Sequence, residues 1–423
     1  MISSTRSPDV VVIGGGIVGR SVASSAARRG MSVIVVEPMS ATFGTSSANA
    51  GHLVPSHCVP FAAPGMVRAG LCSLAARDGA FAIAPRAAIG LVPWLWQFSR
   101  SSTKANVERG VPALRHLLEA TVDELHRLRA AGASLDAADG GILQVCSSVA
   151  GLKSMHHVAQ EWGKWGVRTE ELGAAALRAE EPLLNDSVAG ALRLSDDGRF
   201  DPALLLAAVT DEGHRHGVET LTARVARIEP RSDQLARVHT SDGVLDARRV
   251  VVAAGVWTMS LCRPLGARLP IVAARGNSVT LPDTVRPNSP MLLVEQRMAL
   301  SPLAQGLRLT GGFRLTRPSD RAVDPKRSRE LVERAAQVLT IPGDTPPANE
   351  WTGLRPATTD GLPIIGALAG APTIIVAAGH GMLGSTTGPG TGEVVAALLA
   401  GDSLPFDAAT VSPDRFARHG SGR

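Results

Sequence analysis

The chain has 423 residues, 44% hydrophobic and 19% charged, which excludes a disordered protein and fits a globular protein of roughly two domains. The net charge of +5 comes almost entirely from scattered arginines, and no run alternates basic with aromatic residues, which argues against a nucleic-acid partner. Cys58, Cys72, Cys146 and Cys262 lack the paired spacing of a zinc or thioredoxin motif, so we expect no metal site and reduced, cytoplasmic thiols.

The chain opens with a predicted strand–helix–strand unit over residues 10–13, 17–29 and 33–36. Its first turn places Gly14, Gly16 and Gly19 where a tight turn, a close approach to pyrophosphate and helix–strand packing each require glycine. Glu37 ends the second strand, where its carboxylate can accept hydrogen bonds from a ribose. The unit predicts a bound dinucleotide. Because Glu37 disfavours a ribose phosphate, NAD and FAD remain.

The rest of the chain mixes helices and strands without an internal repeat. Amphipathic helices are predicted over 90–135, a strand near 140–145, helices within 151–180 and a helix over 202–217. A hairpin with an Asp-Gly turn leads to a buried strand at 250–253, followed by several short strands and a charged helix near 327–339. A strand over 373–379 and a helix over 391–401 end the pattern.

Two features of the later chain narrow its function. The segment between Asp360 and Glu393 carries no fixed charge and is long enough to span a bilayer, but its prolines and glycines favour tight turns around a buried ligand. No second GxGxxG motif occurs. If the first site holds FAD, the electrons must therefore come directly from an oxidisable substrate.

Five motifs make the sequence resemble a known family. They are "GTSSANAGH" (44–52), "FAAPGM" (61–66), "VVVAAGVW" (250–257), "WTGLRPATTDGLPIIG" (351–366) and "AAGHGMLGSTTGPGTG" (377–392). Together they resemble the FAD-dependent D-amino-acid oxidase superfamily, with the bacterial D-amino-acid dehydrogenases and D-hydroxyproline and D-proline oxidases nearest.

The resemblance implies an α/β fold of the glutathione-reductase type, in which an α+β substrate domain is inserted into an FAD-binding Rossmann domain. The FAD-binding segments would be residues 1–90, 191–262 and 346–423, and the substrate segments 91–190 and 263–345.

The resemblance also implies which residues bind the flavin, in addition to Gly14, Gly16, Gly19 and Glu37. Ser46, Ser47, Asn49 and Gly51 would meet its phosphates or ring edge from a hydroxyl-rich helix start; the alternative is an ordinary N-cap. The turn of Gly379, Gly381, Met382, Leu383 and Gly384 would aim N–H groups of the last helix at the ring; the alternative is a plain glycine turn. Val225 would bracket the adenine or be a core valine, and Gly255 completes the set.

Arg355 in "GLRP" is the residue that the resemblance assigns to the substrate carboxylate, which a guanidinium binds with two parallel hydrogen bonds. His52 would line the pocket, contact the amine, attach to the flavin or have no reactive role, and His380 is either beside the ring or structural. Relatives often place a tyrosine near the carboxylate; this chain has no tyrosine and carries Asn277 at one such position after Arg275. The preferred substrate therefore stays open.

The predicted reaction is oxidation of a D-amino or D-imino acid, either D-proline, 4-hydroxy-D-proline or a general D-amino acid. Hydride transfer to FAD N5 would give an imine, and oxygen, a quinone or another carrier would accept the electrons. Three alternatives remain: an amine oxidase for sarcosine, glycine or an opine, an NAD-dependent dehydrogenase, and a non-catalytic FAD-binding subunit of a larger complex. We expect a cytoplasmic protein, with peripheral contact to the inner face of the membrane left open.

Overall fold

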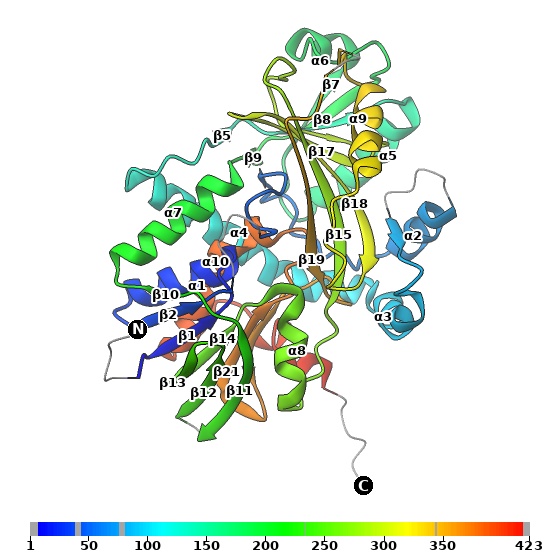
Figure 1. Ribbon diagram of the computed structural model, residues 1–423. Coiled ribbons are helices and arrows are strands. Elements are labelled where there is room, and N and C mark those ends of the chain that lie inside the picture. Colours follow the sequence, from blue (N-terminus) through cyan, green and yellow to red (C-terminus); the bar gives the residue numbers. More distant parts are fainter. Residues whose placement is uncertain (1–6, 39–43, 76–80, 233, 343–344, 418–423) are drawn as a thin grey trace.

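A six-stranded sheet forms the lower body of the molecule in the computed structural model, which describes residues 7–38, 44–75, 81–232, 234–342 and 345–417 (Figure 1). The strand order is β10-β2-β1-β14-β21-β20; the first five strands are parallel and β20 is antiparallel to β21. The strands are β1 (Val10–Ile13), β2 (Val33–Val36), β10 (Glu219–Leu221), β14 (Arg249–Val252), β20 (Ile364–Leu368) and β21 (Ala371–Ala378). The sheet thus gathers segments that lie far apart in the sequence.

Both faces of this sheet are covered, which explains its unbroken runs of valine and isoleucine. Val10 and Val12 pack on helices, whereas Val11 and Ile13 face a three-stranded antiparallel sheet. The helices are α1 (Ile17–Arg28), α4 (Lys104–Ala130) and α10 (Gly384–Ala400), and α7 (Pro202–Arg215) packs on α1 beside them. The small sheet consists of β11 (Val225–Ser232), β12 (Leu235–Thr240) and β13 (Gly243–Ala247).

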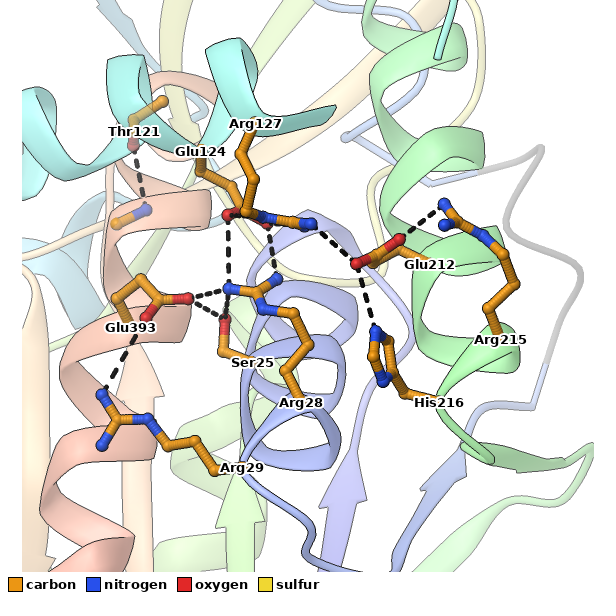
Figure 2. Close-up of polar contacts among 11 residues, drawn as sticks. Ser25, Arg28, Arg29, Thr121, Glu124, Arg127, Glu212, Arg215, His216 and Glu393 are labelled. Atoms are coloured by element: carbon orange, nitrogen blue, oxygen red, sulfur yellow. Dashed lines mark hydrogen bonds and ion pairs between the residues drawn. The ribbon is translucent and has the colours of Figure 1, made fainter. Parts of the chain in front are cut away.

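A buried ion network joins these four helices (Figure 2). Glu124 of α4 is 6% exposed and accepts from Arg28 of α1 at 2.8 Å and from Arg127 at 2.8 Å. Arg127 also reaches Glu212 of α7 at 2.7 Å, and Arg28 pairs with Glu393 of α10. Helix α1 is therefore held to its neighbouring helices by ion pairs as well as by packing.

A nine-stranded mixed sheet forms the upper part of the molecule (Figure 1). Its order is β19-β15-β18-β17-β16-β6-β8-β7, and β4 pairs with β18. The strands are β4 (Phe81–Ile83), β6 (Ile142–Cys146), β7 (Thr169–Gly173), β8 (Gly190–Leu194), β15 (Val272–Leu281), β16 (Met291–Leu293), β17 (Met298–Leu303), β18 (Gly306–Thr316) and β19 (Asn349–Ala357). Around it lie α5 (Val149–Gly163), α6 (Ala174–Glu180) and α9 (Pro325–Ala336).

The remaining elements are short or lie at the side of the molecule. They are β3 (His52–Leu53), β5 (Ala138–Asp139) and β9 (Gly198–Arg199), which form a small sheet, and the helices α2 (Met66–Ala75), α3 (Ala88–Ser101) and α8 (Thr258–Cys262). Within the part of the chain that the structure describes, no helix is long and apolar enough to cross a membrane.

The α/β fold class is confirmed, but several expected elements are wrong in detail. The charged helix near 327–339 is α9 and spans Pro325–Ala336. Two of the strands expected to be short, β15 and β18, have ten and eleven residues. No helix starts at Ser46, because residues 44–50 form turns. The divided FAD and substrate segments stay a prediction.

The largest error concerns α10, which begins at Gly384 and not near residue 391. Its glycines do not form turns around a ligand. A Cβ at Gly390 would lie 2.1 Å from the carbonyl oxygen of Leu117, and one at Gly392 would lie 2.6 Å from the backbone of Ser21. These glycines let α10 pack closely on α4 and α1, a tertiary requirement that overrides their low helix propensity.

Candidate functional site

The turn between β1 and α1 has the geometry of a phosphate-binding turn. Gly14 has a φ of +110° and donates to the carbonyl of Val36 at 2.9 Å; a Cβ there would lie 2.5 Å from the carbonyl oxygen of Ala253. A Cβ at Gly19 would lie 1.9 Å from the carbonyl oxygen of Gly14. Gly16 is the N-cap of α1 and offers no side chain to its N–H groups. The positive end of α1 at this turn would favour a bound anion.

Glu37 lies beside this turn, as expected from its place after β2. Its Oε2 accepts a hydrogen bond from the N–H of Gly15 at 2.6 Å, and a Cβ at Gly15 would lie 3.0 Å from the Glu37 side chain. The carboxylate is thus held at the carboxyl end of the parallel strands, where ligands of open α/β sheets bind.

The segment from Gly44 to His52 makes polar contacts with the first residues of two helices, α1 and α10. Ser46 Oγ accepts from the N–H of Ile17 at 2.9 Å, so Ser46 caps α1 from outside that helix. Asn49 donates to Ser385 Oγ at 2.7 Å and accepts from the N–H of Gly51 at 2.9 Å. We call residues 44–52 the connecting loop, because it links the starts of α1 and α10.

Two other expected residues of the connecting loop have structural roles. The Ser47 hydroxyl is buried and donates to the carbonyl of Gly44 at 3.1 Å. Gly51 has a φ of +69°, and a Cβ there would lie 2.2 Å from the carbonyl oxygen of Phe200. A side chain at position 51 would therefore strain this turn and collide with the backbone of Phe200.

The turn before α10 presents a second uncapped helix start. Gly379 and Gly381 have φ values of +81° and +55°, which side chains rarely adopt. The N-cap Leu383 offers no side-chain acceptor, and Gly384 is the first residue of the helix. Met382 and Leu383 line a cavity. An anionic group in that cavity would lie at the positive end of a 17-residue helix.

The cavity has a volume of about 630 Å³ and lies between the connecting loop, the start of α10, β18, α2 and α3. Its walls are mainly apolar, with Phe61, Phe81 and Phe313 among them. Among the described residues that line it, none is an aspartate or a glutamate.

Arg355 of β19 is a half-buried cation in the described lining of this cavity. Its Nη1 donates to the carbonyl of Gly312 at 2.7 Å, and its guanidinium lies over Gly276, where a Cβ would be 2.4 Å from Nη1. Burial lowers the pKa of Arg355 to about 10, so it stays protonated at neutral pH. No carboxylate in the described ranges forms an ion pair with it. The site can therefore bind a carboxylate without breaking an existing ion pair.

His52 and His57 line the same cavity but carry no charge. Burial lowers the pKa of each to about 4, and each is therefore neutral near pH 7. His52 Nε2 lies 3.0 Å from the carbonyl oxygen of Leu300, which can only accept, so Nε2 carries the hydrogen. His57 was missed in the sequence, where no motif marks it.

Several singled-out residues lie outside the cavity lining. His380 is buried and donates from Nε2 to Thr391 Oγ1 at 2.9 Å, a contact that fixes the turn to α10 and favours its structural interpretation. Arg275 pairs with Asp320 at 2.7 Å. Val225 begins β11 and Gly255 follows β14 with a φ of +54°. Their predicted contacts with a flavin stay predictions.

Comparison with known proteins identifies the family. The family model described as FAD dependent oxidoreductase matches residues 9–398. The chain belongs to this family. The α/β fold, the FAD cofactor and the oxidoreductase activity predicted from the sequence are thereby confirmed, and the NAD-dependent alternative is wrong.

Curated relatives of this FAD-dependent oxidoreductase cover nearly its whole length. A D-amino acid dehydrogenase of Methylobacterium radiotolerans is 33% identical over 96% of this chain and 99% of its own. A D-amino acid dehydrogenase of Cereibacter sphaeroides is 32% identical over 97% of both chains. Among solved structures, glycine oxidase from Geobacillus kaustophilus has a TM-score of 0.75 at 24% identity, covering 96% of this chain and 98% of its own. L-proline dehydrogenase from P. horikoshii has a TM-score of 0.74 at 20% identity, covering 98% of each.

The residues of this chain fit the FAD that the family requires. Neither N-cap residue, Gly16 or Leu383, supplies a side-chain cap, and although Ser46 accepts from the N–H of Ile17, the positive ends of both helices would still favour a phosphate or an electron-rich ring edge. Glu37 would accept from the ribose, and the connecting loop would lie between the phosphate and ring ends of the cofactor. Arg355 is left for the substrate, because it lies on the nine-stranded sheet in the apolar part of the site.

Proposed function

We propose that this FAD-dependent oxidoreductase oxidises D-amino or D-imino acids, including D-proline, 4-hydroxy-D-proline and simple D-amino acids. One observation carries the proposal. The Arg355 guanidinium is half-buried, protonated and without a carboxylate partner in the described chain, and it lines the same cavity as the start of α10, whose N-cap residue gives no side-chain cap. The names of the curated relatives support the same substrate class.

The residues of the cavity would bind and orient the substrate. Arg355 binds the carboxylate through two hydrogen bonds, which fixes the position of the α-carbon. The neutral His52 keeps its Nδ1 lone pair as an acceptor for an amine hydrogen, since Nε2 donates to Leu300. The apolar walls exclude water from the α-carbon. FAD, when bound, would supply the redox chemistry, as the acceptor of a hydride from the α-carbon of a substrate that would become an imine.

The electron acceptor would be oxygen, a quinone or another carrier. A quinone lies in the bilayer, so that choice would place the protein in the cytoplasm at the inner face of the membrane. The absence of acidic residues from the described lining gives no partner to a cationic substrate side chain. We therefore expect D-lysine and D-arginine to be poor substrates.

The test is anaerobic absorbance of the purified protein mixed in turn with D-proline, cis-4-hydroxy-D-proline, D-alanine, D-arginine, sarcosine and glycine. We expect a D-amino acid to bleach the flavin band. Arg355→Ala should raise the half-saturating concentration roughly 10- to 100-fold, the equivalent of a lost charged hydrogen bond of about 1.5–3 kcal/mol. Arg268→Ala, an exposed arginine outside the cavity, is the matched control.

Each outcome of this test separates the alternatives. Bleaching by sarcosine or glycine alone would leave the fold assignment unchanged and would identify the protein as an amine oxidase for these substrates. A yellow protein that no amino acid bleaches would favour the non-catalytic FAD-binding subunit. Equal bleaching by wild type and Arg355→Ala would contradict the role of Arg355.

A further inference from the structure

The turn between β16 and β17 places a second arginine at the cavity. Arg297 ends this turn, and it is exposed while also lining the cavity. Its guanidinium has no ion-pair partner among the residues that the structure describes. The neighbouring acid, Glu295, accepts instead from the N–H groups of Ser147 and Ser148, each at 3.0 Å. Arg297 is therefore an uncompensated positive charge beside a mainly apolar cavity.

The backbone at Arg297 adopts a conformation that favours other residue types. Its φ is +51°, and Asp136 is the only other described non-glycine residue with a positive φ. Glycine or asparagine would adopt this left-handed conformation with less strain. The turn thus gives up backbone stability to carry an arginine side chain at the cavity. Strain of this kind is typical of functional positions.

The pairing of β17 with β18 brings Arg297 to the part of the wall that Arg355 reaches. Met298 of β17 pairs with Gly311 of β18, and the next residues beyond this pair are Arg297 and Gly312. The carbonyl of Gly312 accepts from Arg355, which extends from β19 across β15. Both arginines line the cavity, so they approach it from opposite sides of β18.

A hydroxyl without a partner belongs to the same wall. Thr310 lines the cavity and is 6% exposed, and its Oγ1 has no hydrogen-bond partner in the described chain. It lies two residues before Gly312 on β18 and pairs with Ala299, two residues after Arg297. Buried hydroxyls are nearly always hydrogen-bonded, so this exception needs an explanation. A polar ligand group bound at this wall would supply the missing partner.

We propose that Arg297 and Thr310 form a second anion site in the cavity, and that the protein prefers D-amino acids whose side chains end in a carboxylate, such as D-glutamate. Arg355 binds the α-carboxylate, and Arg297 binds the side-chain carboxylate, which also accepts from the Thr310 hydroxyl. No aspartate or glutamate in the described lining competes for Arg297. This inference rests on the proposed function only for the role of Arg355.

The experiment compares glutarate with valerate, five-carbon acids that carry two carboxylates and one. Binding to the flavin-loaded protein is measured from the change in flavin absorbance and requires no turnover. We expect glutarate to bind at least about tenfold more tightly, as an added charged hydrogen bond implies. The apolar walls by themselves would favour valerate. Arg297→Asn should remove the preference for glutarate, because asparagine tolerates a positive φ but carries no charge. Thr310→Val should reduce this preference about threefold or more.

The matched control is Arg268→Asn, which removes an exposed arginine outside the cavity and should keep the preference of wild type. Valerate that binds wild type as tightly as glutarate would overturn the proposal, as would equal preferences in Arg297→Asn and Arg268→Asn. In turnover, the ratio of kcat/KM for D-glutamate to that for D-glutamine should fall about tenfold or more in Arg297→Asn. Selective glutarate binding by a protein that no D-amino acid bleaches would contradict the proposed reaction and still support the second anion site.

Discussion

Gly276 is the single residue whose lack of a side chain sets the position of Arg355. A Cβ at this position would lie 2.4 Å from the guanidinium nitrogens. The backbone of Gly276 pairs in register with Gly353 of β19 and lies at an irregularity in the pairing of β15 with β18. We expect Gly276→Ala to displace the guanidinium and raise KM for a D-amino acid about tenfold or more, with a smaller change in kcat, because carboxylate binding is lost more than chemistry. Steady-state kinetics of the flavin-loaded protein measure this split.

The control for Gly276→Ala is Gly163→Ala at the end of α5, which does not line the cavity and has nothing within 4 Å of its Cβ position. It should leave KM within about twofold, since no contact to the substrate is removed. A KM for Gly276→Ala equal to that of wild type would mean that Arg355 does not bind the carboxylate from its present position.

The environment of Asp197 predicts how the stability of the protein depends on pH. Its carboxyl is 2% exposed and bonds to the N–H and hydroxyl of Ser56 at 3.0 and 2.6 Å. Burial raises its pKa to about 7 despite those hydrogen bonds. The folded protein then holds a proton that the unfolded chain releases near pH 4, so the free energy of unfolding should fall as pH rises from about 4 to about 7.

Asp197→Asn mimics the protonated carboxyl and should remove this dependence. Relative to wild type, we expect the variant to gain stability on the order of 2–4 kcal/mol between pH 4 and pH 8, the equivalent of the shift in pKa. Urea unfolding of both proteins across this pH range measures the difference. Parallel curves for the two proteins would show that the carboxyl is ionised in the folded state throughout.

At the scale of elements, α10 depends on glycine for its packing. The N–H of Gly390 donates to Thr121 Oγ1 at 2.9 Å, and a Cβ at Gly390 would lie 2.1 Å from the carbonyl oxygen of Leu117. Gly390→Ala should therefore destabilise the protein by about 1–3 kcal/mol through overpacking, although alanine is the better helix former. Gly90→Ala in α3 is the control, because nothing lies within 4 Å of its Cβ position. That control should be neutral or slightly stabilising in thermal unfolding.

The same helix shows what the sequence could and could not reveal. The elements β1, α1 and β2 were predicted within one residue, because their glycines and valines act locally. The start of α10 was missed, because "GSTTGPG" has low helix propensity and becomes helical only through contacts with α1 and α4. Ser46 was expected at a helix start of its own, yet it caps α1, 29 residues earlier in the chain. Motifs indicated where the cofactor residues lie, but not which of them support one another.

At the scale of the whole molecule, the helices that pack on the six-stranded sheet supply the two helix starts, and the nine-stranded sheet supplies Arg355. The site therefore depends on how these two sheets and their helices are held together. The connecting loop is one link. Thr45 exchanges hydrogen bonds with the backbone of Leu354, the neighbour of Arg355, at 3.1 and 3.2 Å. Ser301 and Arg308 of the nine-stranded sheet donate to the carbonyls of Ala50 and Asn49. These contacts explain why the cavity residues come from distant segments that no local pattern could connect.

The ion network of Figure 2 gives the last prediction at this scale. Glu124 is buried and shared by Arg28 and Arg127, so Glu124→Gln leaves two cations with less compensation. We expect the free energy of unfolding, measured with urea, to fall by about 3 kcal/mol. Flavin should be released in the same transition, because the glycine turn lies at the start of α1. Glu161→Gln, in an exposed pair with Lys164, should leave the free energy of unfolding close to that of wild type. If both variants lowered the free energy of unfolding equally little, the ion network would not contribute to stability, and apolar packing alone would hold α1 against α4.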